Sequence, residues 1–158
     1  MNQIRLGKTD ILPDAVRGLL SVVLALCILI FSAGCEKAPV EPVNISSNDV
    51  CYYCKSPIID LQYAAEFITN DGFVRKFDDF SCLMESARKV GRKKISAFYV
   101  MDVRSKTLVP AEQVQFVRCE NVPTPRQSGI VAFKDASTAE SFAASSSGKL
   151  VTLSDLLE

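Results

Sequence analysis

Hydrophobic and polar residues change their spacing along the chain, and these changes predict the main elements. Residues 19–31 form an almost unbroken apolar run, whereas residues 36–49 are polar and contain two prolines. From residue 62 onward, short stretches rich in apolar, β-branched and aromatic residues are separated by polar turns, as in half-buried strands. Two later stretches have helical spacing, so the chain predicts a mixed domain of strands and helices.

Six short strands are expected in the larger, C-terminal part of the chain. Asn70-Asp71-Gly72 lies between the first two and is a strong hairpin signal, because these residue types tolerate the backbone of tight turns. The expected strands cover residues 62–69, 73–77, 96–103, 114–119, 129–133 and 150–152.

Two helices are expected between these strands. The first covers residues 81–90, with its apolar residues on one face and Gly91 as its stop. The second begins at Ser137, where Ser137 and Glu140 match a capping box, and it ends before Gly148.

A faint internal repeat links the two helices. Phe77-Asp78-Asp79-Phe80-Ser81 opens the first, and Phe133-Lys134-Asp135-Ala136-Ser137 opens the second, so both share the pattern Phe-x-Asp-x-Ser. In both cases two strands precede the helix. The expected fold class is therefore α+β, built from two packed β-β-α-type units.

The N-terminus has the features of an export signal. Basic residues precede the apolar run, whose 13 residues are fewer than the roughly 20 that span a membrane. Small residues then lead to Cys35, whose thiol can accept a lipid, as in a bacterial lipobox with Ser32 in place of the usual leucine. We expect residues 1–34 to be a lipoprotein signal peptide; the alternative is an uncleaved signal anchor.

These segments predict a location and a domain plan. Residues 35–49 would be a flexible tether, and residues 50–158 would form the folded domain. Either kind of anchor puts the domain outside the cytoplasm, on the periplasmic side of the cell envelope. Glu36 follows the lipid-bearing cysteine in place of the usual retention aspartate, which favours the outer membrane over the inner membrane.

Charge and residue content exclude several function classes. Without residues 1–34 the chain has 15 basic and 16 acidic residues, a near-neutral balance that argues against nucleic acid as a partner. The sequence contains no histidine. Ser-His-Asp and Cys-His catalysis, histidine metal ligands and c-type haem attachment are thereby excluded.

Cysteines are the remaining candidates for chemistry. Of six, one lies in the signal and one is the lipid candidate. In an oxidising compartment four thiols suggest two disulfides, and a metal site is the competing interpretation. The four are Cys51, Cys54, Cys82 and Cys119.

The pair Cys51-x-x-Cys54 can hold one soft ion, because the chain can turn around it. A thioredoxin-type dithiol is disfavoured, since a polar segment precedes the pair and Pro57 follows it closely. A disulfide is the alternative. Cys119 ends a strand and offers only a fourth sulfur.

Cys82 lies in the first turn of the expected helix, where the helix dipole favours a thiolate. Asp78 and Asp79 would oppose thiolate formation by their charge, although Asp79 is better explained as the helix N-cap. The alternative for Cys82 is a small buried residue, and Met84 is expected to be a core residue.

Several motifs, in this order and spacing, resemble the NosL family of lipoprotein copper chaperones of the nitrous oxide reductase system. The resemblance covers residues 50–158 and the export signal. It implies two β-β-α-β-like units, related to organomercurial lyase, and delivery of Cu(I) to a periplasmic copper enzyme. The motifs are Cys51-x-x-Cys54, residues 63–68, Asp71-Gly72, Phe77-Asp78-Asp79 with Cys82, residues 97–102 and Ala132-Phe133.

This chain departs from the usual family pattern at two places. Cys54-Lys55-Ser56 stands where Cys-Gly-Met is usual, and Pro125-Arg126-Gln127 stands where Pro-Met-Gly is usual, often with a histidine nearby. The expected metal ligands are therefore three thiolates, those of Cys51, Cys54 and Cys82. Such a set suits Cu(I), or Zn(II) with a fourth ligand such as Cys119.

The expected function is that of a membrane-tethered accessory protein, not an enzyme, which binds Cu(I) and delivers it to a client such as nitrous oxide reductase. One alternative is a disulfide-stapled or zinc-binding surface lipoprotein without copper delivery. Another is an organomercurial-lyase-like enzyme with Cys82 and Asp79 as its thiol and acid. The expected partners are the membrane, reached through the lipid, and copper-handling proteins.

Overall fold

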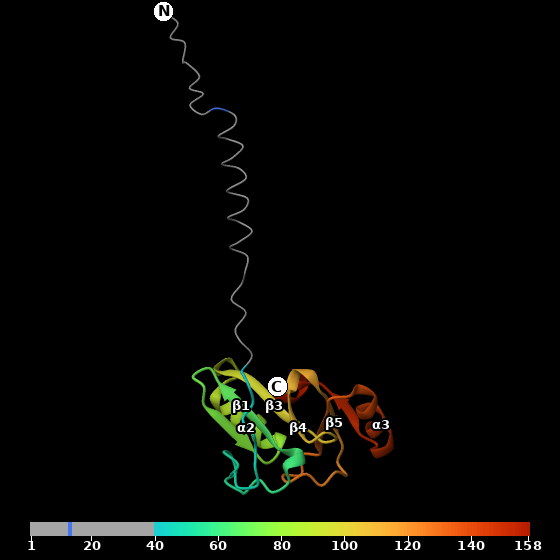
Figure 1. The fold of residues 1–158 in the computed structure, drawn as a ribbon. Helices are drawn as coiled ribbons and strands as arrows, with labels where there is room; N and C mark the ends of the chain where they lie inside the picture. Colours follow the sequence, from blue (N-terminus) through green and yellow to red (C-terminus); the bar gives the residue numbers. More distant parts are fainter. Residues whose placement is uncertain (1–12, 14–39) are drawn as a thin grey trace, which may run out of the picture. The chain divides into compact units, whose positions relative to one another are not determined.

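Two antiparallel sheets, each covered by its own helix, make up the chain between residues 40 and 158 (Figure 1). The computed structural model describes residues 13 and 40–158. Apart from Pro13, the expected signal peptide and Cys35 lie outside the described residues. Within the described part, no helix combines the length and apolar character needed to cross a membrane.

The first half contains a four-stranded sheet in the order β2-β1-β3-β4. Helix α2 packs against this sheet. The elements are the 3-10 turn η1 (Leu61–Tyr63), β1 (Ala65–Thr69), β2 (Val74–Phe77), α2 (Phe80–Val90), the 3-10 turn η2 (Arg92–Lys94), β3 (Ile95–Asp102) and β4 (Thr107–Pro110).

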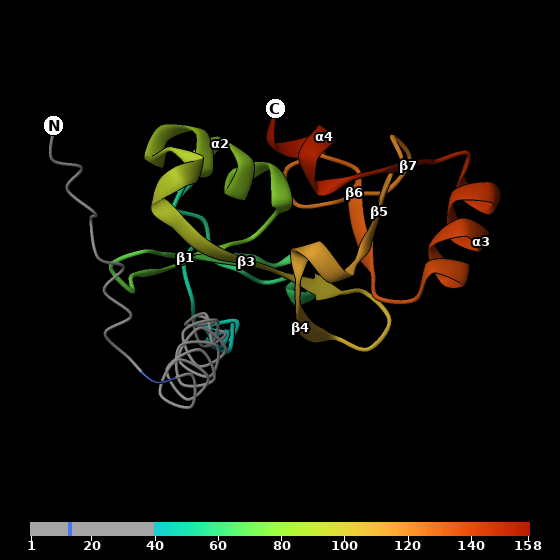
Figure 2. The same ribbon diagram turned by 90° about the horizontal axis from the view of Figure 1, so that it is seen from above.

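The second half contains a three-stranded sheet in the order β6-β5-β7. Helix α3 packs against it, and Figure 2 shows α2 and α3 at opposite ends of the domain. The elements are the 3-10 turn η3 (Ala111–Gln113), β5 (Gln115–Arg118), β6 (Ile130–Phe133), α3 (Ala136–Ser146), β7 (Lys149–Val151) and α4 (Leu153–Leu157).

The internal repeat expected from the sequence is present, and it confirms the α+β class. Both halves run β-β-α-β, and the first strand of each lies between the second and the third. Asp79 and Asp135 are the N-caps of α2 and α3. Ser81 Oγ donates to the Asp79 carboxylate at 2.8 Å, and Ser137 Oγ donates to the Asp135 carboxylate at 2.6 Å.

Several element predictions differ from the structure in detail. The expected strand 62–69 begins as the turn η1, and the short elements β4 and α4 were not expected. The prediction of a capping box at Ser137 is wrong. Asp135 caps α3 because its carboxylate accepts the backbone N–H of Thr138 at 2.7 Å, while the Ser137 hydroxyl serves as a donor to that carboxylate.

The larger of two hydrophobic clusters spans both halves, and the smaller lies between α3 and its own sheet. Phe80 of α2 and Phe116 of β5 contact each other with ring centroids 4.9 Å apart. Phe67 and Phe77 form another close pair, at 5.1 Å, between β1 and β2. Each such buried ring contributes roughly 1.5–3 kcal/mol through the apolar area it removes from water. The core therefore fixes the end of β2 relative to α2, where the candidate site lies.

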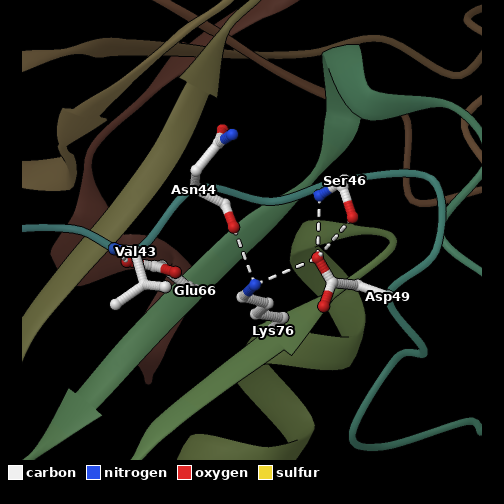
Figure 3. A network of polar contacts seen from close by, with 6 residues as sticks. All are labelled: Val43, Asn44, Ser46, Asp49, Glu66 and Lys76. Carbon is white, nitrogen blue, oxygen red and sulfur yellow. Dashed lines mark hydrogen bonds and ion pairs between the residues drawn. The ribbon is translucent and has the colours of Figure 1, made fainter.

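The described unit begins at Val40 rather than at residue 50, so residues 40–49 belong to the domain and not to a free tether. Ile45 is buried in the core, and Val43 N–H donates to Glu66 Oε1 at 2.7 Å (Figure 3). Lys76 Nζ donates to Asn44 O at 2.7 Å. The polar composition of residues 36–49 predicts a tether. Backbone hydrogen bonds do not depend on residue type, and one buried isoleucine is too weak a signal to predict that part of this segment belongs to the domain.

Glu66 lies fully buried beneath this segment. Its Oε2 has no hydrogen-bond partner among the described residues, and burial raises the pKa of its carboxyl to about 6. A raised carboxyl pKa stabilises the fold when the group is protonated. This contribution is complete below the ordinary pKa of 4.5 and is lost as the pH rises through about 6.

Glu66→Gln is therefore expected to raise the free energy of unfolding at pH 7 by about 1–2 kcal/mol, because a neutral amide removes the buried charge. The variant should also lose the fall in stability that the parent chain shows between pH 4.5 and pH 6. Denaturant unfolding at several pH values measures both effects. A variant less stable than the parent at pH 7 would contradict this explanation.

Candidate metal centre

The Cys51-x-x-Cys54 segment is a closed loop that turns both thiols toward one point. Val50 and Pro57 form an isolated antiparallel bridge across its base. Within the loop, Cys51 N–H donates to Ser56 O at 2.8 Å, and Lys55 N–H donates to Cys51 O at 3.0 Å. These bonds fix the loop before any ion binds.

Lys55 adopts a positive φ of 64° in this loop. Glycine adopts this conformation without strain, whereas a lysine there loses stability on the order of 1 kcal/mol. This is the position at which the NosL family usually carries glycine. The loop therefore has a left-handed turn at a position that favours glycine, although this chain has lysine there.

Strand β2 holds the loop beside helix α2. Tyr52 N–H donates to Lys76 O at 2.8 Å, and the Tyr52 ring packs edge-on against Phe77 with centroids 6.4 Å apart. Asp78 and Asp79 follow β2 directly, and α2 begins at Phe80. The loop, the end of β2 and the first turn of α2 therefore meet in one place.

Asp79 caps α2 as the sequence predicted. Its carboxylate accepts the Ser81 N–H at 2.8 Å and the Arg126 N–H at 3.0 Å. Burial raises the pKa of Asp79, but these and neighbouring hydrogen bonds lower it by more than burial raises it. The pKa of Asp79 therefore lies below the ordinary value. One oxygen is thus occupied in capping and the other by Arg126, and no hydrogen bond joins the Cys82 thiol to the Asp79 carboxylate in the part of the chain that the structure describes.

The structure brings Cys51, Cys54 and Cys82 together with Asp78. One ligand atom from each lies within 4.8 Å of the others. Four ligands about 2.0–2.3 Å from an ion would stand slightly closer, so small side-chain movements suffice to complete a site. Cys51, Asp78 and Cys82 are buried, whereas Cys54 is half-exposed, which leaves the group accessible from one side.

The pKa values of two thiols at this site are shifted in opposite directions. Hydrogen bonding to the Cys82 thiol lowers the pKa of Cys51 to about 6, and the same contact raises the pKa of Cys82. Cys54 Sγ lies 3.4 Å from Asp78 Oδ2, while Asp78 Oδ1 is buried with no partner among the described residues. The group therefore has negative charge and free acceptor atoms, both of which attract a cation.

We expect the metal-free domain to hold one thiolate at pH 7. The thiolate absorbance near 240 nm should fall as the pH is lowered through about 6, the pKa of Cys51. In Cys82→Ala, which lacks the hydrogen-bond donor, the midpoint should move up toward the ordinary value of 9.0. An unchanged midpoint in that variant would mean that another group stabilises the thiolate.

The other sulfur candidates lie outside the group. Cys119 Sγ lies 3.1 Å from the Ser146 carbonyl oxygen, at the end of β5, and Met84 is part of the core. Cys51, Cys54, Cys82 and Cys119 are free thiols, so the two-disulfide arrangement is not found among the described residues. The Pro125-Arg126-Gln127 segment lies against the start of α2 through the Arg126–Asp79 bond.

From the sequence, Asp78 is expected to oppose thiolate formation by its charge, and it is not among the expected metal ligands. The structure shows it buried, with one oxygen free. Its signal was its place between a strand and an N-cap. The Asp79 carboxylate is bound by the Ser81 N–H in capping the helix, whereas the preceding side chain, that of Asp78, contacts Cys54 of the loop.

Comparisons with known proteins bear on the family and the fold. A model of the NosL family matches residues 42–158. The crystal structure of the copper chaperone NosL from Shewanella denitrificans superimposes with a TM-score of 0.65 at 19% identity, covering 74% of this chain and 96% of that chain. No curated protein matches. At this identity the likeness establishes the fold.

Proposed function

Because the chain belongs to the NosL family, we propose that it is a copper-binding accessory protein. It receives Cu(I) at Cys51, Cys54 and Cys82 and passes the ion to a copper enzyme such as nitrous oxide reductase. The observation that carries this proposal is the convergence of three thiols, from a loop and a helix start far apart in sequence, on one point. The similar protein of known structure is a copper chaperone.

The donor set supports Cu(I) as the cargo. Thiolates are soft ligands, and Cu(I) binds them with low coordination numbers, so three sulfurs are sufficient. The half-exposed Cys54 gives a partner's ligands a route to the ion. A site that must release its ion needs such an open side, and for this reason the proposed role is delivery and not catalysis or structural binding.

Asp78 favours Zn(II) as a second candidate. A carboxylate oxygen among three sulfurs completes the four-coordinate tetrahedral set that Zn(II) prefers. This makes Asp78, rather than Cys119, the fourth ligand in the zinc alternative. Cu(I) has little affinity for a hard oxygen, so the two ions would use the same group differently.

Anaerobic titration of the mature chain with Cu(I) and with Zn(II), followed by mass spectrometry of the complexes, tests the proposal. One Cu(I) per chain, held against competition by Zn(II), is the expected result. Preferential retention of Zn(II) would favour the second candidate. If neither ion binds the reduced chain, the group is not a metal site.

We also propose that the chain is a lipoprotein anchored in the cell envelope, with the domain facing the periplasm. Cys35→Ser should block processing at residues 34–35 and leave a longer precursor without lipid, because this thiol follows the small-residue cleavage segment. Mass spectrometry of the protein from membranes measures both changes. Normal processing of the variant would instead indicate another anchor.

A further inference from the structure

A groove bordered by positive charge opens beside the metal-binding group. It has a volume of about 590 Å³ and is lined chiefly by Tyr52, Tyr53, Lys55, Arg75 and Lys89. Its lining includes no carboxylate among the residues that the structure describes. The proposed metal-handling function does not use these side chains.

The groove is lined by residues of the cysteine loop and of α2, the two segments that carry the thiols. Its two tyrosines occupy the positions between the two cysteines of the loop. On α2, Ser86 and Lys89 follow Cys82 by about one and two turns, so they lie on the same face of the helix. Cys54, the half-exposed thiol, directly precedes Lys55. A molecule bound in the groove would therefore lie against the loop that carries Cys51 and Cys54.

The positive charges are held in place by the tyrosine rings. Lys55 Nζ lies 4.6 Å and Arg75 Cζ lies 4.3 Å from the centroid of the Tyr52 ring. Lys89 Nζ lies 4.6 Å from the centroid of Tyr53. Within residues 40–158 these three cations form no ion pair with a carboxylate. Asp71 lines a neighbouring hollow together with Arg75 and Lys89, but among residues 40–158 it forms no ion pair with them. Three positive charges thus stand together on the two rings, with no carboxylate bonded to them in this part of the chain.

We infer that this groove is the docking surface for an acidic segment of the protein that exchanges the metal ion with this chain. This inference rests on the proposed function. Carboxylates of such a segment would pair with the three cations, and the tyrosines would supply apolar contact and hydroxyl groups. Charge of this kind speeds encounter and sets orientation, while a small interface still allows rapid release after transfer.

The shape of the surface favours a protein over a membrane as the partner. The cations border a hollow with aromatic walls, which a loop carrying carboxylates can enter, whereas a bilayer presents a broad surface. The hollow also lies beside Cys54, and a partner that takes the ion must bring its own soft ligands to that thiol. Binding of the groove to anionic lipid is therefore the alternative that the test must distinguish.

The test uses the full chain in neutral detergent and a fluorescent glutamate-rich peptide, with a second peptide in which every glutamate is glutamine. Fluorescence anisotropy should show that the acidic peptide binds about tenfold more tightly at low salt, and that this preference disappears at about 1 M salt. The triple variant Lys55→Glu, Arg75→Glu and Lys89→Glu should lose the preference. Lys89→Glu alone, on an exposed helix position, should reduce it severalfold if the triple variant misfolds.

A matched control changes three exposed basic residues that do not line the groove, Lys106, Arg118 and Lys149, to glutamate and should keep the preference. An equal preference in the groove variants and the parent would overturn the inference. So would groove-dependent binding to phosphatidylglycerol vesicles with no binding of the acidic peptide. Because anisotropy needs no metal, a failure of Cu(I) to bind would refute the proposed function without changing this result.

Discussion

Cys82→Ser is expected to lower the Cu(I) affinity of the chain by more than the roughly 10–100-fold typical of losing an outer-shell partner. Cys82 supplies one of three sulfurs, and serine puts a hard, protonated oxygen in its place. It is also the group that keeps the pKa of Cys51 near 6 through their hydrogen bond, so the variant loses a ligand and raises the proton competition at a second one. Competition with a Cu(I) chelator of known affinity measures the change.

Two matched variants separate ligand loss from general damage. Cys119→Ser removes an equally buried thiol outside the group, and Met84→Leu removes a sulfur from the core. Both should change Cu(I) affinity little. Affinity close to the parent's in Cys82→Ser would reduce the site to Cys51 and Cys54. Loss of the ion in Cys119→Ser, with retention in Cys54→Ser, would reverse the assignment.

Much of the fold could be predicted from local signals. The hairpin at residues 70–72, the stop of α2 at Gly91 and the cap at Asp79 each depend on a few neighbouring residues, and all are found in the structure. The internal repeat could be recognised in the sequence because phenylalanine, aspartate and serine recur at the same spacing where each helix begins. The elements that sequence missed, β4 and α4, are four and five residues long and have too few positions to show a period.

The site was predictable only in part, for a physical reason. Cysteine pairs at short spacing and a cysteine at a helix start are visible in sequence, and the structure brings those three thiols together. Whether the carboxylate of Asp78 lies inside the group depends on which way the chain turns between β2 and α2. Residues 40–49 present the same difficulty, because their contacts with β1 and β2 join segments far apart in the chain.

The repeat also shows why the group of cysteines with an aspartate lies in the first half and not in the second. In the second half, Lys134 occupies the position of Asp78, and Thr138 occupies that of Cys82. No cysteine loop stands beside that junction: Cys119, the second half's cysteine, hydrogen-bonds to Ser146 O. The two junctions therefore share the phenylalanine, the cap and the serine that build the frame, and they differ in the side chains that could hold an ion.

Asp79→Ala is expected to lower the free energy of unfolding by about 2 kcal/mol. The loss of an N-cap costs roughly 0.5–2 kcal/mol, and the backbone N–H of Arg126 would lose its hydrogen bond to the carboxylate, at about 0.5–1.5 kcal/mol. The equivalent cap in the second half is the matched control. Asp135 is exposed and serves its own helix alone, so Asp135→Ala should destabilise the domain less.

Acid should reduce the difference between Asp79→Ala and the parent chain. The pKa of Asp79 is lowered in the fold, so its contribution is present above the ordinary value of 3.8 and is lost as the pH falls through the folded pKa. Denaturant unfolding at pH 7 and at about pH 3 measures the effect for both cap variants. If Asp79→Ala and Asp135→Ala cost the same at pH 7, the Arg126 contact adds nothing to stability, and the loop at residues 124–128 is not tied to the first half through this carboxylate.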